Sequence, residues 1–132
     1  MENFYNWFVG FVDGEGCFSC TLNNGSLNFR FKISLRADDK DILEEIRNKL
    51  GFGKVVYEPY YRRNIVLKGK PQYKFVLYSK KDREKLIEIL DTYPLRSKKK
   101  KDYEVWKMLH NGLEEKILLV NRLKEVRQYS LN

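Results

Sequence analysis

Hydrophobic residues along this chain switch between helical spacing and strict alternation, and the same succession occurs twice. Residues 28–35 alternate between apolar and polar side chains, which predicts a strand with one buried face. Residues 17–23 predict a neighbouring strand, and Asn24-Gly25 between the two segments is typical of a tight hairpin turn. The first unit of the succession therefore begins with an antiparallel pair.

A helix is expected after this pair, from about residue 39 to residue 50. Its buried stripe has helical spacing and consists of Ile42, Leu43, Ile46 and Leu50. Asp38 is placed to cap the start of this helix, and Gly51 is placed to end it.

The second unit repeats the order, with strands expected at residues 54–62 and 71–78. A Lys-Gly segment at residues 66–70 supplies the turn between them. Ser79 is placed to cap the following helix, which Pro94 ends. The buried stripe of that helix consists of Leu86, Ile87 and Leu90.

Three further helices are expected around the two units. One begins at Phe4, one carries Trp106 and Leu109, and one follows Gly112. The 132 residues form one domain, 1–132, of the α+β class. Four antiparallel strands make one sheet, and the helices cover its apolar face.

The other face of the expected sheet carries amides, hydroxyls and cations. Alternation places on it Ser19, Thr21, Asn23, Asn28, Arg30, Lys32, Ser34, Gln72 and Lys74. The segment 54–62 adds Lys54, Tyr60 and Arg62, mixed with Val56 and Glu58. Such groups contact base edges and phosphates, so this face is a candidate nucleic-acid surface. A plain solvated face is the alternative, although it would more often interleave acids with bases.

The net charge favours the same interpretation. Lys plus Arg number 26 and Asp plus Glu number 18, which gives a formal charge of +8. A small basic domain attracts polyanions, although charge that serves only solubility is the alternative. No apolar stretch is long enough to span a membrane and no secretory signal is visible, so we expect an intracellular protein with no membrane partner.

Cys17 and Cys20 form a Cys-x-x-Cys pair, which invites a metal or redox interpretation. A structural zinc site needs four ligands, whereas the chain has no second cysteine pair and a single histidine, His110. Residues three apart on a strand also point to opposite faces. We therefore expect Cys20 in the core and Cys17 on the other face.

The segment Phe4–Phe18 carries most of the candidate chemistry. Gly10 and Gly14 lie four residues apart on the expected first helix, where small residues let a second helix approach closely. Asp13 and Glu15 stand where this helix ends. The segment therefore predicts paired helices that bring paired carboxylates to one place.

Four lysines, Lys98–Lys101, stand at the expected start of a helix. Cations there oppose the helix dipole, at a cost of about 0.3–1 kcal/mol each. Violations of a local rule are frequent at functional sites, and a lysine near a phosphate would stabilise the charge that develops during phosphodiester cleavage. A solvated basic stretch is the alternative.

Residues 7–16, WFVGFVDGEG, resemble the LAGLIDADG motif of homing endonucleases. The motif's glycine, first acid, second acid and final glycine correspond to Gly10, Asp13, Glu15 and Gly16. Residues 93–99, YPLRSKK, are similar to the basic segment of that family, and the αββαββα order matches its fold. The chain is thereby identified as a member of this family.

The resemblance implies a site-specific endonuclease that cuts double-stranded DNA. One copy of the motif implies a homodimer whose motif helices pack together through Trp7, Gly10, Phe11 and Gly14. Two saddle-shaped sheets then read a long, nearly palindromic site in the major groove, and cleavage leaves 3′ overhangs. Further DNA contacts are expected from Arg36, Lys99 and Lys100.

In the family, the second acid of the motif and the backbone carbonyl before it bind a divalent metal. Carried over, these ligands are Glu15 and Gly14, and oxygen ligands suit Mg²⁺, which Mn²⁺ is expected to replace. Asp13 is the rival ligand, but in a helix it points about 200° away from Glu15. We expect Glu15 at the metal and Asp13 to tie down the helix end.

The catalytic lysine of the family falls on Lys98, with Lys99 or Lys100 as the alternatives after a register shift. Some relatives have a polar residue at the end of the second strand, where this chain has Leu35 followed by Arg36, a departure from the family pattern. Two other functions fit the same scaffold. They are an RNA maturase that binds its host intron RNA, and a DNA-binding regulator without catalysis.

Overall fold

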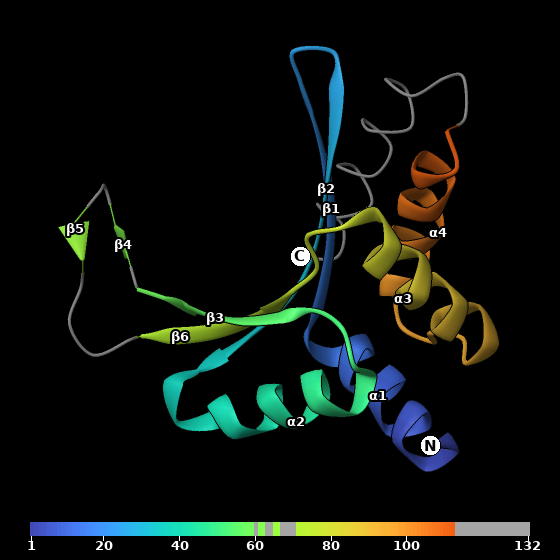
Figure 1. The fold of residues 1–132 in the computed structure, drawn as a ribbon. Helices are drawn as coiled ribbons and strands as arrows, with labels where there is room; N and C mark the ends of the chain where they lie inside the picture. Colours follow the sequence, from blue (N-terminus) through green and yellow to red (C-terminus); the bar gives the residue numbers. More distant parts are fainter. Residues whose placement is uncertain (60, 63–64, 67–70, 113–132) are drawn as a thin grey trace.

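The computed structural model describes all residues except 60, 63–64, 67–70 and 113–132, and gives residues 61–62 and 65–66 as backbone only. Its helices and strands are α1 (Glu2–Glu15), β1 (Gly16–Asn23), β2 (Ser26–Arg36), a 3-10 turn (Ala37–Asp39), α2 (Lys40–Leu50), β3 (Lys54–Glu58), β4 (Tyr61–Arg62), β5 (Ile65–Val66), β6 (Gln72–Val76), α3 (Lys80–Thr92) and α4 (Lys99–His110) (Figure 1). No helix in the described part of the chain is long and apolar enough to cross a membrane.

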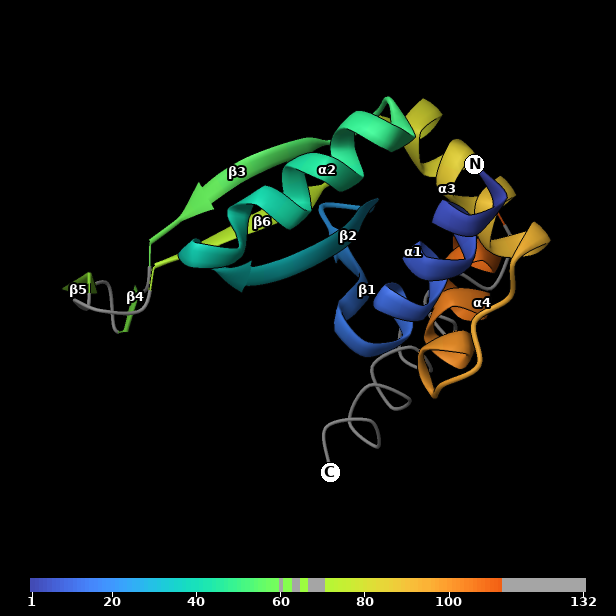
Figure 2. The same ribbon diagram turned by 90° about the horizontal axis from the view of Figure 1, so that it is seen from below.

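The expected four-stranded antiparallel sheet is confirmed, and its strand order is β1-β2-β6-β3. Helices pack against one face, with α2 against β3 and β6 and α1 beside the start of β1 (Figure 2). The core between these layers contains Phe8, Val12, Phe18, Phe31, Ile33, Leu43, Ile46, Phe75, Leu86 and Trp106. The apolar half of each alternating pattern therefore faces the helices, as the sequence predicts.

Helix ends agree with the sequence at α3 and differ at the start of α2. The Ser79 hydroxyl accepts a hydrogen bond from the Asp82 backbone N–H at 3.0 Å, so Ser79 caps α3. Gly51 follows α2 with φ of 78°, a left-handed conformation that glycine adopts without strain. The expectation that Asp38 caps α2 is wrong, because a 3-10 turn precedes the helix and places Asp39 at the cap position without a side-chain cap.

The strand expected over residues 54–62 is shorter in the structure. β3 ends at Glu58, and the backbone of Tyr61–Arg62 pairs instead with Ile65–Val66 as a separate two-stranded ladder (Figure 1). This ladder continues the β3–β6 hairpin away from the helices. Tyr60 and the helix expected after Gly112 lie outside the described residues.

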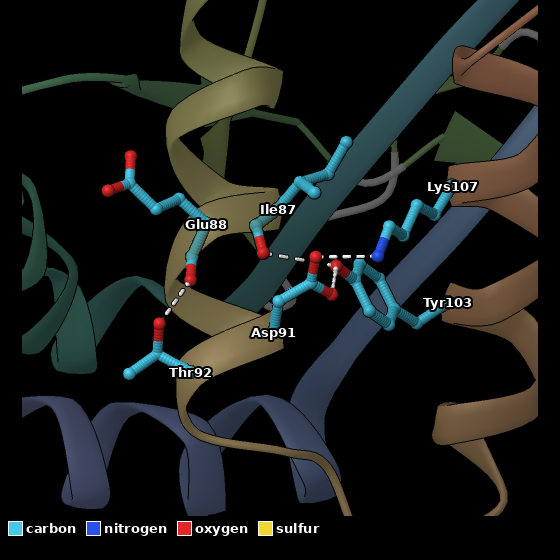
Figure 3. A network of polar contacts seen from close by, with 6 residues as sticks. All are labelled: Ile87, Glu88, Asp91, Thr92, Tyr103 and Lys107. Carbon is cyan, nitrogen blue, oxygen red and sulfur yellow. Dashed lines mark hydrogen bonds and ion pairs between the residues drawn. The ribbon is translucent and has the colours of Figure 1, made fainter.

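A polar cluster joins the last turns of α3 to the middle of α4 (Figure 3). The Tyr103 hydroxyl lies 2.8 Å from Asp91 Oδ1 and 3.2 Å from the Ile87 carbonyl oxygen, and the Lys107 ammonium forms an ion pair with Asp91 Oδ2. Burial, then the Asp91 carboxylate, raises the pKa of the Tyr103 phenol, so its proton stays in place as the donor. The cluster fixes α4 against α3 one turn after the lysine run.

Candidate nucleic-acid interface and acidic site

The sheet face that points away from the helices carries its side chains in rows across the strands. Read from β2 through β6 to β3, the rows are Lys32–Val76–Lys54, Ser34–Lys74–Val56 and Arg36–Gln72–Glu58. Between β2 and β1 the opposed pairs are Lys32–Cys17, Arg30–Ser19, Asn28–Thr21 and Ser26–Asn23. We call these residues the polar sheet face.

The polar sheet face brings together the described strand residues that the sequence placed there. Cys17 also lies on it, whereas Cys20 is buried in the core, as expected. Burial raises the pKa of the Cys20 thiol to about 11, so this thiol stays protonated and apolar at neutral pH. Tyr60 and the side chain of Arg62 lie outside the described part of the chain, so their positions are not assigned.

Part of this face is hollowed where β6 ends before β2 does. β6 ends at Val76, opposite Lys32, whereas β2 begins at Ser26, so residues 26–31 have no β6 partner on that side. A hollow of about 600 Å³ lies there, and its lining includes Arg30, Lys32, Lys74, Tyr78 and Arg83. Three cations on the strands and a fourth from α3 thus surround one concave surface.

Sequence reasoning missed Arg83, which belongs to α3, and left Tyr78 out of the DNA contacts although it expected the strand 71–78 to reach that residue. In the structure β6 ends two residues earlier, at Val76. Tyr78 follows β6 with 62% of its surface exposed, and the Lys54 ammonium lies 5.6 Å from the centre of its ring. The Arg83 guanidinium lies 5.1 Å from the centre of the Phe29 ring. The signal in the sequence for Tyr78 was its alternation with Gln72 and Lys74, which places it on the same face of the expected strand.

The two acids at the end of α1 have different surroundings. The Asp13 carboxylate accepts hydrogen bonds from the backbone N–H groups of Arg96 and Ser97, at 3.0 and 2.9 Å to Oδ1. The Ser97 hydroxyl donates in return to the Asp13 carbonyl oxygen at 3.1 Å. Asp13 therefore ties the end of α1 to the segment that leads into α4.

Glu15 is exposed, and no residue in the described structure forms a hydrogen bond or an ion pair with its carboxylate. The Lys99 ammonium lies 3.4 Å from the Gly14 carbonyl oxygen, at a carbonyl that has no partner inside the helix. Lys98 occupies the position before the first turn of α4 and is exposed. Of the lysines in the run, Lys99 is thus the one whose ammonium touches the end of α1.

Two oxygen donors, the Glu15 carboxylate and the Gly14 carbonyl, lie at adjacent residues on the chain. Within the described residues there is no group of three or more His, Cys, Asp or Glu side chains placed to hold a metal. A hard divalent cation such as Mg²⁺ prefers oxygen ligands and keeps several waters, so two donors from one chain suit it when phosphate oxygens complete the shell. The residues present therefore fit such an ion.

One side of α1 is open and apolar. An added Cβ on Gly10 or Gly14 would meet no other atom within 4 Å. Trp7 is 44% exposed and stacks on Phe11 at 5.1 Å between ring centres. The four residues expected to form the dimer interface thus share an exposed helix face that begins beside Glu15.

Leu35, where some relatives of this family have a polar residue, packs against the core from the helix side of the sheet. Its neighbour Arg36 lies on the polar sheet face in one row with Gln72 and Glu58. The last residue of β2 on the polar sheet face is therefore Arg36.

The sequence profile of the LAGLIDADG endonuclease family matches residues 8–110. The chain is 38% identical over 109 residues to the uncharacterized mitochondrial protein RF1 of Saccharomyces cerevisiae, covering 82% of this chain and 21% of that protein. It is 32% identical over 118 residues to the probable intron-encoded endonuclease Cox1-I1b of Schizosaccharomyces pombe, covering 86% of this chain and 28% of that protein. The chain therefore spans less than a third of the length of each of these relatives, 21% and 28%.

Two solved structures illustrate the likeness in fold. The LAGLIDADG meganuclease I-AabMI bound to uncleaved DNA superposes with a TM-score of 0.69 at 30% identity, over 81% of this chain and 35% of that chain. The archaeal intron-encoded homing endonuclease I-Vdi141I complexed with DNA gives 0.75 at 22% identity, over 96% and 86%. The fold, the glycine-rich helix ending in two acids and the matching profile together show that this chain belongs to the LAGLIDADG endonuclease family.

Proposed function

We propose that this chain is a site-specific endonuclease that cuts double-stranded DNA as a homodimer with a divalent metal. The observation that carries the proposal is the position of Glu15, a carboxylate without a partner among the described residues, at the junction of α1 with the first strand of the polar sheet face. I-AabMI and I-Vdi141I, which share this fold, have been solved with DNA.

The polar sheet face would bind DNA in the major groove. Its cations supply the phosphate attraction, and its amides and hydroxyls can bond to base edges. Val56 and Val76 lie among these polar groups, where an apolar side chain can contact a thymine methyl group. A two-fold dimer would repeat this surface and so favour a nearly palindromic site.

Glu15 and the Gly14 carbonyl would hold Mg²⁺ or Mn²⁺, which when bound supplies an activated water and compensates charge on the phosphate. In the hydrolysis, water adds to phosphorus while the P–O3′ bond breaks, which leaves a 5′-phosphate and a 3′-hydroxyl. A proton leaves the attacking water, and the departing 3′ oxygen takes one up. Cuts on the two strands, displaced across the minor groove, would leave 3′ overhangs.

Lysines at the start of α4 would stabilise the charge on the cleaved phosphate. Asp13 holds Arg96 and Ser97, and this places the run that follows beside Gly14. Lys98 is the family's position for this role, and Lys99 is the lysine that reaches the end of α1 in the structure. Both ammonium groups are proposed to bind phosphate oxygens. The lysine whose replacement lowers kcat more is the catalytic one.

Cleavage is tested with purified protein, a randomised duplex library and Mg²⁺, followed by sequencing of new ends. We expect staggered cuts at one reproducible site, and none with Glu15→Gln. Glu2→Gln removes a carboxylate from the first turn of the same helix and should leave the cuts unchanged. Tight binding without cuts by the wild type would instead indicate a DNA-binding regulator. Intron splicing supported by Glu15→Gln would indicate a maturase.

A further inference from the structure

Glu58 is the one acid among the described strand residues of the polar sheet face. Its Oε2 lies 3.0 Å from Lys74 Nζ on the neighbouring strand, and the two side chains are 30% and 29% exposed. Both line the hollow on this face, together with Arg30 and Lys32. A carboxylate on a surface that meets phosphates opposes binding, so its presence there requires a reason.

Neutralisation of Lys74 is a poor reason. An ion pair whose side chains keep almost a third of their surface exposed contributes little to the stability of the fold. The carboxylate and the ammonium gain more when they meet a ligand that offers a donor to the first and an acceptor to the second.

The edge of a base pair offers such groups at the matching separation. In the major groove, cytosine presents its N4 amino donor beside the O6 acceptor of guanine. These two atoms are hydrogen-bonded to each other, so they lie about 2.9 Å apart. The 3.0 Å between Glu58 Oε2 and Lys74 Nζ is likewise an ordinary hydrogen-bond distance, so one acceptor and one donor on the protein can meet the donor and the acceptor of one base pair together.

We infer that Glu58 and Lys74 together read one C·G pair in each half-site, with Glu58 accepting from cytosine N4 and Lys74 donating to guanine. This inference rests on the proposed function. An adenine–thymine pair also presents an amino donor beside a carbonyl acceptor, but guanine adds N7 as a second acceptor for the ammonium. Thymine instead places its methyl group beside O4, so C·G is the better fit.

The test is selection of bound duplexes from a randomised library in EDTA, so that no strand is cut. The wild type should enrich cytosine at one position in each half-site. Glu58→Gln should shift that position from cytosine towards adenine by about tenfold, because glutamine bonds to adenine N6 and N7. Lys74→Met should lose the cytosine preference and bind more weakly.

Glu45→Gln is the matched control, because Glu45 forms an ion pair with Lys49 on the outer face of α2, 3.2 Å apart. It should leave the base preference at every position of the bound duplexes unchanged. A Glu58→Gln variant that binds more tightly to all duplexes with an unchanged base preference would overturn the inference, as would enrichment of a base other than cytosine by the wild type. Failure of the wild type to enrich any site would instead overturn the proposed function.

Discussion

Asp13 and Glu15 stand two residues apart at the end of α1, and their contacts indicate different roles, a structural one for Asp13 and a metal-binding one for Glu15. Both oxygens of Asp13 lie within 3.1 Å of the Arg96 N–H, and one of them also accepts from Ser97. A metal bound to Asp13 would compete with these bonds. Glu15 has no such contact in the described structure and can serve a metal without disturbing the fold.

Replacing Asp13 should therefore loosen the connection between α1 and the start of α4. Asp13→Ala removes the acceptor for two backbone N–H groups. Because this acceptor is a charged carboxylate, its loss should lower the stability more than the loss of an average contact does. We expect the free energy of unfolding to fall by about 1–2 kcal/mol, measured by urea denaturation. Cleavage should also fall, because the lysine run loses its position beside Gly14.

Asp13→Asn is the matched control for this prediction. Its amide oxygen can still accept from both N–H groups, although without the charge, so it should keep more than half of the stability that alanine loses. Equal losses for the two variants would show that the bonds to Arg96 and Ser97 contribute little.

The sequence predicted the described helices and the strands of the main sheet, because each buries one side of a regular pattern. It could not predict where the strand from Lys54 ends, since that depends on pairing with β6 and on the separate β4–β5 ladder. It also left open which lysine approaches the end of α1. Residues 94–97 are not helical, so spacing alone does not give the direction of each lysine that follows.

The packing of α4 against β2 and α3 predicts a dependence of stability on pH. The His110 ring lies 5.7 Å from the Phe29 ring and 6.2 Å from the Trp106 ring, between centres. Burial, then the charge of Arg83, lowers the pKa of His110. Folded His110 thus resists protonation, whereas the unfolded histidine gains a proton near its usual pKa of about 6.5.

The free energy of unfolding should therefore decrease as the pH falls through this range, because the unfolded state binds more protons. The effect is measured by comparing the urea midpoints at pH 7.5 and at about pH 5.5. Both pH values lie above the usual pKa range of Asp and Glu, so the carboxylates stay ionised. His110→Gln should reduce the difference between the two midpoints. An unchanged difference would assign the pH dependence to other groups.

At the scale of the whole molecule, the proposed homodimer makes this chain one half of a symmetric arrangement. The open face of α1, the exposed Glu15 and the first strand of the polar sheet face follow one another along the chain, so a two-fold copy packed on α1 would bring both Glu15 residues to the same contact.

Substitutions at Gly10 should have opposite effects on the stability of one chain and on the association of two chains. Inside one chain the position is open, so Gly10→Ala should stabilise the helix by about 0.5–1 kcal/mol, and Gly10→Leu should also fold. In a dimer the added side chain separates the two helices, so we expect Gly10→Leu to be a monomer by light scattering with DNA present and to cut nothing.

Glu45→Leu adds the same side chain on the exposed face of α2 and should remain dimeric and active. A dimeric Gly10→Leu variant, or a wild type that is monomeric on DNA, would show that α1 is not the contact between copies.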